Sequence, residues 1–156
     1  MPIGVVLEID HSLARWLEKV ASNIDVAIED ALPIVELLLS AESNPNSLTN
    51  NDGEPIGEPI FEAINHPIGQ LTTALVALWY KENPMDGDGL PAWLASNLEL
   101  ISNSKEPRLR HGKTIVAQHL IALYRVDPEW TRSNLCLLYT SPSPRDATLS
   151  RMPSSA

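Results

Sequence analysis

Apolar residues recur at helical spacing through the middle of the chain. Ile68, Leu71, Leu75, Leu78 and Trp79 share one face of an expected helix. This helix opens at Asn65-His66-Pro67, because a short polar residue and a following proline are typical of helix N-termini. The stretch from Asn65 to Trp130 therefore predicts packed helices.

Further helices follow the same pattern. One begins with Pro91 at its first position, and the next begins near Pro107. A third restarts at Asp127-Pro128-Glu129, with Asp127 as the cap and Glu129 facing the helix dipole. The apolar positions of the first two are Trp93, Leu94, Leu98 and Ile101, and then Leu109, Val116, Leu120, Leu123 and Tyr124.

The first forty residues also favour helices. The apolar run Ile3–Ile9 is predicted as coil or helix, because nothing later offers it a partner strand. Asp10 or Ser12 then caps a helix that carries Leu13, Trp16, Leu17 and Val20. Residues 24–41 continue the spacing, and Pro33 predicts a kink in one helix in preference to two helices.

The segment 42–59 is rich in Asn, Ser, Pro and Gly and predicts a long loop that divides the helical region, with one helical turn after it at 59–64. The expected fold class is all-α, an irregular helical array or α-solenoid-like fragment. The residues show no clean internal period, so a regular repeat family is not indicated. The four tryptophans fit the apolar stripes and are predicted to lie in the core: Trp16, Trp79, Trp93 and Trp130.

The sequence of residues 136–156 indicates that this segment does not come from the natural gene. CLLYTS matches the translated mosaic end of a transposase-based sequencing library, and PSPRD and SRMPSSA match the adjoining adapters in the same order and frame. We therefore expect a disordered, non-native tail after Leu135, and a natural protein that continues beyond 1–135. The only cysteine, Cys136, belongs to this tail, so the redox compartment cannot be inferred.

Acidic groups dominate the first hundred residues. Without Arg145, Arg151 and Asp146 of the tail, the chain has 9 basic and 19 acidic side chains. Residues 1–100 hold 3 basic and 16 acidic groups, whereas residues 101–135 hold 6 and 3. This balance argues against general nucleic-acid binding. The chain has neither an apolar run long enough to cross a membrane nor a signal peptide at its start, so we expect a soluble, cytoplasmic protein.

Two groups of residues suggest metal binding, and in both a structural interpretation is favoured. Asp86-Gly87-Asp88-Gly89 resembles the start of a calcium loop, but the twelfth position is Asn97 instead of glutamate, so a turn is expected. His66, His111 and His119 lack the spacing of a zinc site, and His119 is expected to be a hydrogen-bonded packing residue. Neither a catalytic motif nor a cofactor motif appears, so no catalytic, cofactor or metal residue is assigned.

Five basic residues gather around the start of the Pro107 helix: Lys105, Arg108, Arg110, His111 and Lys113. Basic groups at a helix N-terminus are mildly unfavourable for that helix, which suggests contact with an anion or an acidic partner. The alternative is that they pair with the acidic first hundred residues inside the fold.

Three stretches resemble a known type of region. NHPIGQLTTALVALWY, GLPAWLASNLELI and RHGKTIVAQHLIALYRVDPEWT are similar to the helical C-terminal region of large bacterial proteins that carry a sirtuin-like, NAD-consuming domain, many of them linked to anti-phage defence. The resemblance implies a non-catalytic scaffolding, sensing or oligomerisation region that contacts other domains of its parent or a protein partner. It carries over no site residue, and the NAD pocket is absent from this sequence. The alternatives are a fragment of an enzyme whose catalytic domain lies outside the chain, and a nucleic-acid-contacting helical module that uses the basic residues.

Overall fold

The computed structural model describes residues 3–40 and 59–140, and the side chains within 12–40 and 59–135. Over these ranges every regular element is helical, which confirms the predicted all-α class. In chain order the elements are α1 (Ile3–Asn23), α2 (Ile28–Ser40), α3 (Pro59–Asn65), α4 (Pro67–Lys81), α5 (Ala92–Asn103), the 3₁₀ turn η1 (Pro107–Leu109), α6 (Arg110–Gln118), α7 (Leu120–Val126) and α8 (Pro128–Thr140).

Helix α4 is the centre of the fold. The five apolar residues predicted to share its inner face are all buried, and so are Gln70, Thr72, Ala74 and Val76 on its other sides. A helix that is buried all round lies in the interior of a domain. None of the described helices is both long enough and apolar enough to cross a membrane.

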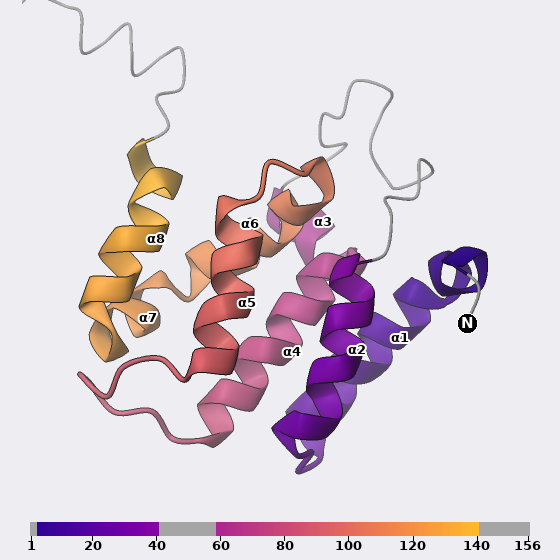
Figure 1. Ribbon diagram of the computed structural model, residues 1–156, viewed down its shortest axis with the longest axis horizontal. Coiled ribbons are helices and arrows are strands. Elements are labelled where there is room, and N and C mark those ends of the chain that lie inside the picture. The colour runs from indigo at the N-terminus through magenta and orange to yellow at the C-terminus, as the bar shows by residue number, and fades with distance from the viewer. Residues whose placement is uncertain (1–2, 41–58, 141–156) are drawn as a thin grey trace, which may run out of the picture.

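Five helices surround α4: α1, α2, α3, α5 and α6 (Figure 1). Helices α1 and α2 pack on one side of it, and α5 and α6 pack on another. Helix α3 lies against α6 and α4, while α7 and α8 pair at the far end beside α5 and α6. Because α1 packs chiefly on α4 and only slightly on its neighbour α2, this arrangement does not confirm a solenoid, in which each repeat contacts the next one along the chain.

Helix α1 runs without a break through Ile3–Ile9, so the cap predicted at Asp10 or Ser12 is wrong. Its buried stripe consists of Ala14, Leu17 and Ala21. Trp16 lies outside that stripe and is 51% exposed, which contradicts its predicted place in the core.

Helix α2 begins at Ile28, four residues later than expected, and continues as one helix across Pro33, as predicted. Most of the predicted loop 42–59 lies outside the described residues. Its last residue, Pro59, begins α3, and this short helix confirms the predicted helical turn.

Helix α4 opens within Asn65-His66-Pro67, as predicted, but its N-cap is His66 and not the short polar residue Asn65. The Nδ1 atom of His66 accepts a hydrogen bond from the backbone N–H of Ile68 at 3.1 Å. The Asn65 side chain instead donates to the carbonyl of Phe61, at 2.8 Å, and so closes the end of α3. Histidine is not a favoured N-cap residue, so the sequence pattern pointed to its neighbour.

The helix expected from Pro107 to Tyr124 is divided at His119, whose φ of −98° and ψ of 9° leave the α-helical region. Helix α7 resumes where the N–H of Leu123 donates to the carbonyl of His119 at 2.9 Å. The Tyr80 hydroxyl lies 3.1 Å from His119 Nδ1, so a contact with α4 fixes the imidazole at the break. Tyr124, predicted on the apolar face, is 42% exposed.

The ends of α5 and α8 also refine the prediction. Pro91 is the N-cap of α5 and not its first residue. Asp127 caps α8 as predicted, because its Oδ1 accepts from the N–H of Trp130 at 2.9 Å. Helix α8 continues to Thr140, so Cys136–Thr140 of the expected tail are helical, and the rest of the tail lies outside the described residues.

Candidate functional site

Arg108, from the predicted basic group, closes the C-terminal end of α2. Its guanidinium donates to the carbonyl of Leu38 at 3.2 Å and also to the carbonyl of Leu39. Its Nε donates to a carboxylate oxygen of Glu106 at 2.8 Å. The last carbonyls of a helix have no partner within the helix and carry negative partial charge, so a cation there stabilises the helix end.

The remaining basic side chains point to different joints of the fold. Lys113 donates to the carbonyl of Ser104 at 2.6 Å, at the end of α5. Arg110 lies 4.0 Å from the carboxylate of Glu62 on α3, and Lys105 is exposed. The structure thus directs three of these cations to carbonyls or carboxylates of the fold. A role of the group in binding an anion or a partner stays a prediction.

His111 stacks on His66 in the interior. The ring centroids are 3.9 Å apart and the planes are inclined by 17°, and both residues are buried. Burial, together with the nearby Arg110, lowers the pKa of His111, while Glu62 acts in the opposite direction. Because the Nδ1 of His66 accepts a backbone N–H, that atom carries no proton. The pair therefore suits neutral imidazoles that join α3, α4 and α6.

Two glycines allow this close packing. A Cβ at Gly69 would lie 1.7 Å from the carbonyl oxygen of Ala63 on α3, and a Cβ at Gly112 would lie 2.6 Å from Ile101 Cγ2 and 2.9 Å from Thr72 Oγ1. Gly69 therefore lies where two backbones approach closely, whereas Gly112 leaves room for side chains of α4 and α5. At the same joint, Oε1 of Glu62 is buried without a hydrogen-bond partner.

His119 and Tyr80 form a second polar contact, at the junction of α6 and α7. Their rings meet edge to face with centroids 5.7 Å apart, in addition to the hydrogen-bond distance between Tyr80 Oη and His119 Nδ1. Burial lowers the pKa of His119 and raises the pKa of Tyr80, so both side chains favour their neutral forms. This agrees with the prediction that His119 is a hydrogen-bonded packing residue.

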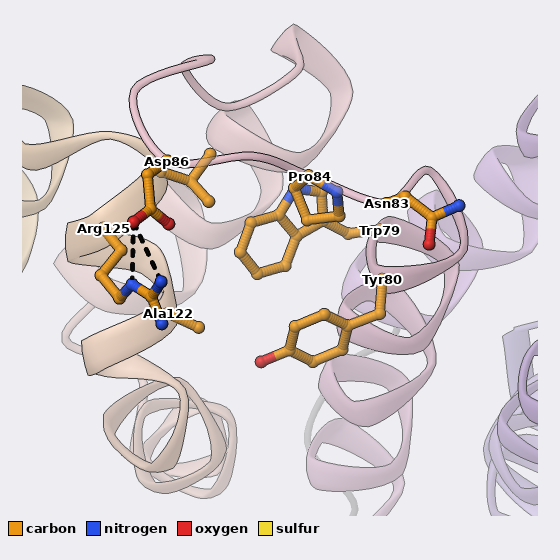
Figure 2. A pocket seen from close by; sticks show the side chains of 8 residues that line it. Trp79, Tyr80, Asn83, Pro84, Asp86, Ala122 and Arg125 are labelled. Atoms are coloured by element: carbon orange, nitrogen blue, oxygen red, sulfur yellow. Dashed lines mark hydrogen bonds and ion pairs between the residues drawn. The ribbon is translucent and has the colours of Figure 1, made fainter.

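An open hollow of about 370 Å³ lies beside this contact (Figure 2). Tyr80 extends from α4 toward the helix that carries Ala122 and Arg125, and the Asp86–Arg125 pair forms the opposite wall. Arg125 donates to one carboxylate oxygen of Asp86 through Nη2 at 2.9 Å and through Nε at 3.2 Å. The volume suits a small ligand, but the charged groups of the wall already satisfy each other.

The predicted turn at Asp86–Gly89 is confirmed. Gly87 and Gly89 have positive φ, and their N–H groups donate to the carbonyls of Arg125 and Val126 at 3.0 and 2.9 Å. Asp88 accepts from the N–H of its own turn at Met85, at 3.0 Å. Within the part of the chain that the structure describes, no three His, Cys, Asp or Glu side chains are grouped so as to hold a metal ion.

Asp127 links this turn to α8. Its Oδ2 accepts from the N–H of Leu90 at 3.1 Å while its Oδ1 caps α8. The cap was predictable from the sequence but the second bond was not, because nothing local to Asp127 indicates a partner 37 residues away. The His66–His111 stack was missed for the same reason, although Gly69 and Gly112 within helical patterns are a signal of close packing.

Comparison with protein families, with curated proteins and with solved structures found no match to this chain.

Proposed function

We propose that this chain is a non-catalytic helical interaction region, which binds other protein surfaces as part of a larger bacterial protein. The observation that carries the proposal is that each of two helices has two large, exposed apolar side chains on its outer face. The charged side chains of Arg108, Lys113 and Asp127, in contrast, are engaged at helix ends.

The two exposed pairs lie on α3 and α7. Phe61 and Ile64 on α3 are 66% and 46% exposed, and Ile121 and Tyr124 on α7 are 76% and 42% exposed. Residues three apart lie on the same side of a helix, so each pair forms a short apolar stripe. Single exposed apolar residues are ordinary, whereas grouped ones, especially aromatic ones, are typical of sites that contact another protein.

The resemblance of three stretches to a helical region of large bacterial proteins supports the part of the proposal that places this chain in such a protein. Regions of that type accompany NAD-consuming domains of bacterial defence proteins, where a helical region would scaffold, sense or assemble. The engaged polar groups at Arg108, Lys113 and Asp127 favour a supporting role over catalysis, because each has a structural partner.

A site-specific photocrosslinking experiment in bacterial cells tests this function. A photoreactive amino acid is placed at Phe61 or at Ile121, and matched variants carry it at the exposed polar positions Gln118 and Ser133. We expect discrete protein adducts from the two apolar positions and none from the polar controls. Equal labelling at all four positions, or none at any, would refute an interaction role for these stripes.

A further inference from the structure

The α1–α2 layer forms one outer side of the fold. Both helices bury their inner stripes against α4 (Ala14, Leu17 and Ala21 on α1, and Ala31, Val35 and Leu38 on α2). On the sides opposite these stripes, the described side chains of both helices are mostly exposed. These exposed sides of α1 and α2 together form the α1–α2 outer face.

Among the side chains that the structure describes, the two helices carry opposite charge on this face. Arg15 and Lys19 on α1 are exposed and are two of the three basic residues in the first hundred. The exposed side of α2 carries Glu29, Asp30 and Glu36 and no basic residue. Among the described residues, none of these five takes part in an ion pair within 4.0 Å.

Neighbouring charged side chains do not neutralise the basic residues on α1 or the acidic residues on α2. Glu18 lies beside Arg15 and Lys19, but burial raises its pKa, and those two cations only partly oppose that shift. Lys81, from the end of α4, lies 3.9 Å from Asp25 and donates to the carbonyl of Ile24 in the α1–α2 turn. Within the described part of the chain, the acidic residues Glu29, Asp30 and Glu36 on α2 therefore have no cation within 4.0 Å.

Apolar side chains accompany both charged stripes. Trp16 next to Arg15 is 51% exposed, Ile24 at the end of α1 is 57% exposed, and Leu37 next to Glu36 is 37% exposed. A surface with apolar groups and two complementary charged stripes can pair with itself about a two-fold axis. In such pairing α1 of one copy faces α2 of the other, and every contact is made twice.

We propose that the α1–α2 outer face binds a second copy of this chain as a symmetric dimer, with Arg15 and Lys19 of each copy against Glu29 and Glu36 of the other. This inference rests on the proposed interaction role and specifies one partner for it. Trp16 and Leu37 lie at the centre of the interface, and the ion pairs set its register.

The size of the face predicts the strength of the dimer. Helices of 21 and 13 residues are roughly 31 and 20 Å long and about 10 Å wide, so their face covers about 500 Å² in each copy. The total of about 1,000 Å² is at the lower end of specific interfaces. We therefore expect a concentration-dependent dimer with a dissociation constant in the micromolar range, which weakens as salt screens the ion pairs.

Sedimentation equilibrium of the full 156-residue chain at low salt, with charge-reversed variants, tests the dimer. Arg15→Glu with Lys19→Glu makes both stripes acidic, and Glu29→Lys with Glu36→Lys makes both basic. Each variant alone should dimerise at least about tenfold more weakly, because like charges face each other. An equimolar mixture of the two should recover dimer, since an acidic face then meets a basic one.

The control Glu82→Lys with Glu99→Lys changes net charge equally at exposed positions outside this face and should dimerise as the unmodified chain does. Circular dichroism establishes that each variant is folded. A monomer at every concentration up to about 200 µM, above the expected micromolar range, would overturn the dimer. So would a mixture of folded variants that fails to associate. If crosslinks from Phe61 and Ile121 persist in that case, the proposed function stands and only this inference falls.

Discussion

Replacement of Gly69 by alanine tests the close contact between α3 and α4. A Cβ there would lie 1.7 Å from the carbonyl oxygen of Ala63 and 2.6 Å from its carbonyl carbon, whereas ordinary contacts begin at 3.4 Å. The end of α3 would have to move by roughly 1.7 Å, and both atoms belong to the backbone, so no rotamer change relieves the clash. Ala63 is fully buried, so the movement also disturbs packing in the core.

The magnitude follows from two opposing effects. Alanine is favoured over glycine inside a helix by about 1 kcal/mol, while overpacking of a core costs about 1–3 kcal/mol and occasionally more. The backbone clash is severe, so we expect Gly69→Ala to lower the free energy of unfolding by about 2 kcal/mol, which corresponds to roughly 5–10 °C in Tm.

Urea unfolding followed by circular dichroism and tryptophan fluorescence measures the change. The control Ala117→Gly, at an exposed position of α6, isolates helix propensity and should cost about 1 kcal/mol. If Gly69→Ala stabilises the protein, as propensity alone requires, the close approach of α3 to α4 is not as described.

Three further predictions follow from single side chains. The folded protein holds the pKa of His111 below 6.5, so the unfolded chain binds more protons as pH falls below about 6.5. The free energy of unfolding should therefore decrease from pH 7.5 to pH 5.5, by at most about 1.4 kcal/mol per pH unit for this histidine. If urea titrations give the same free energy at every pH, the burial of His111 is contradicted. Asp127→Ala removes both the α8 cap and the bond to Leu90 and should cost about 1–3 kcal/mol in thermal unfolding, with Asp127→Asn intermediate; equal stability of all three proteins would contradict the double role. Arg108→Met should cost about 1–3 kcal/mol and speed amide exchange in the last turn of α2, and unchanged exchange there would show that the guanidinium does not hold that helix end.

The sequence predicted the helices best where apolar spacing was regular. The inner face of α4 and the cap of α8 were identified because both depend on residues within one or two turns of each other. Errors arose where a distant contact decided the outcome. The break at His119 accompanies a contact with Tyr80, 39 residues away, and no local pattern indicates it.

The candidate site shows the same limit. The cluster of basic residues around Arg108 was visible in the sequence, but the groups that its guanidinium contacts were not. The carbonyls that accept hydrogen bonds from this guanidinium lie 70 and 69 residues earlier in the chain. Helical periodicity predicts which residues share a face, and it contains no information on which other helix meets that face. Trp16 illustrates the converse, since an aromatic residue near an apolar stripe was taken for core and is half exposed.

The enclosure of α4 has a consequence for how the molecule opens. Leu71, Leu75 and Trp79 are covered by helices from both earlier and later parts of the chain, so their amides can reach solvent only after several neighbours detach. Helix α7 has only seven residues, of which Leu123 and Val126 are buried, so fewer neighbours must detach before it opens. Native-state hydrogen exchange should therefore rank α4 slowest, near the rate set by global unfolding, and α7 among the fastest. Transient openings that expose new surface to a partner would then begin at the rim of the fold, while its central helix stays closed.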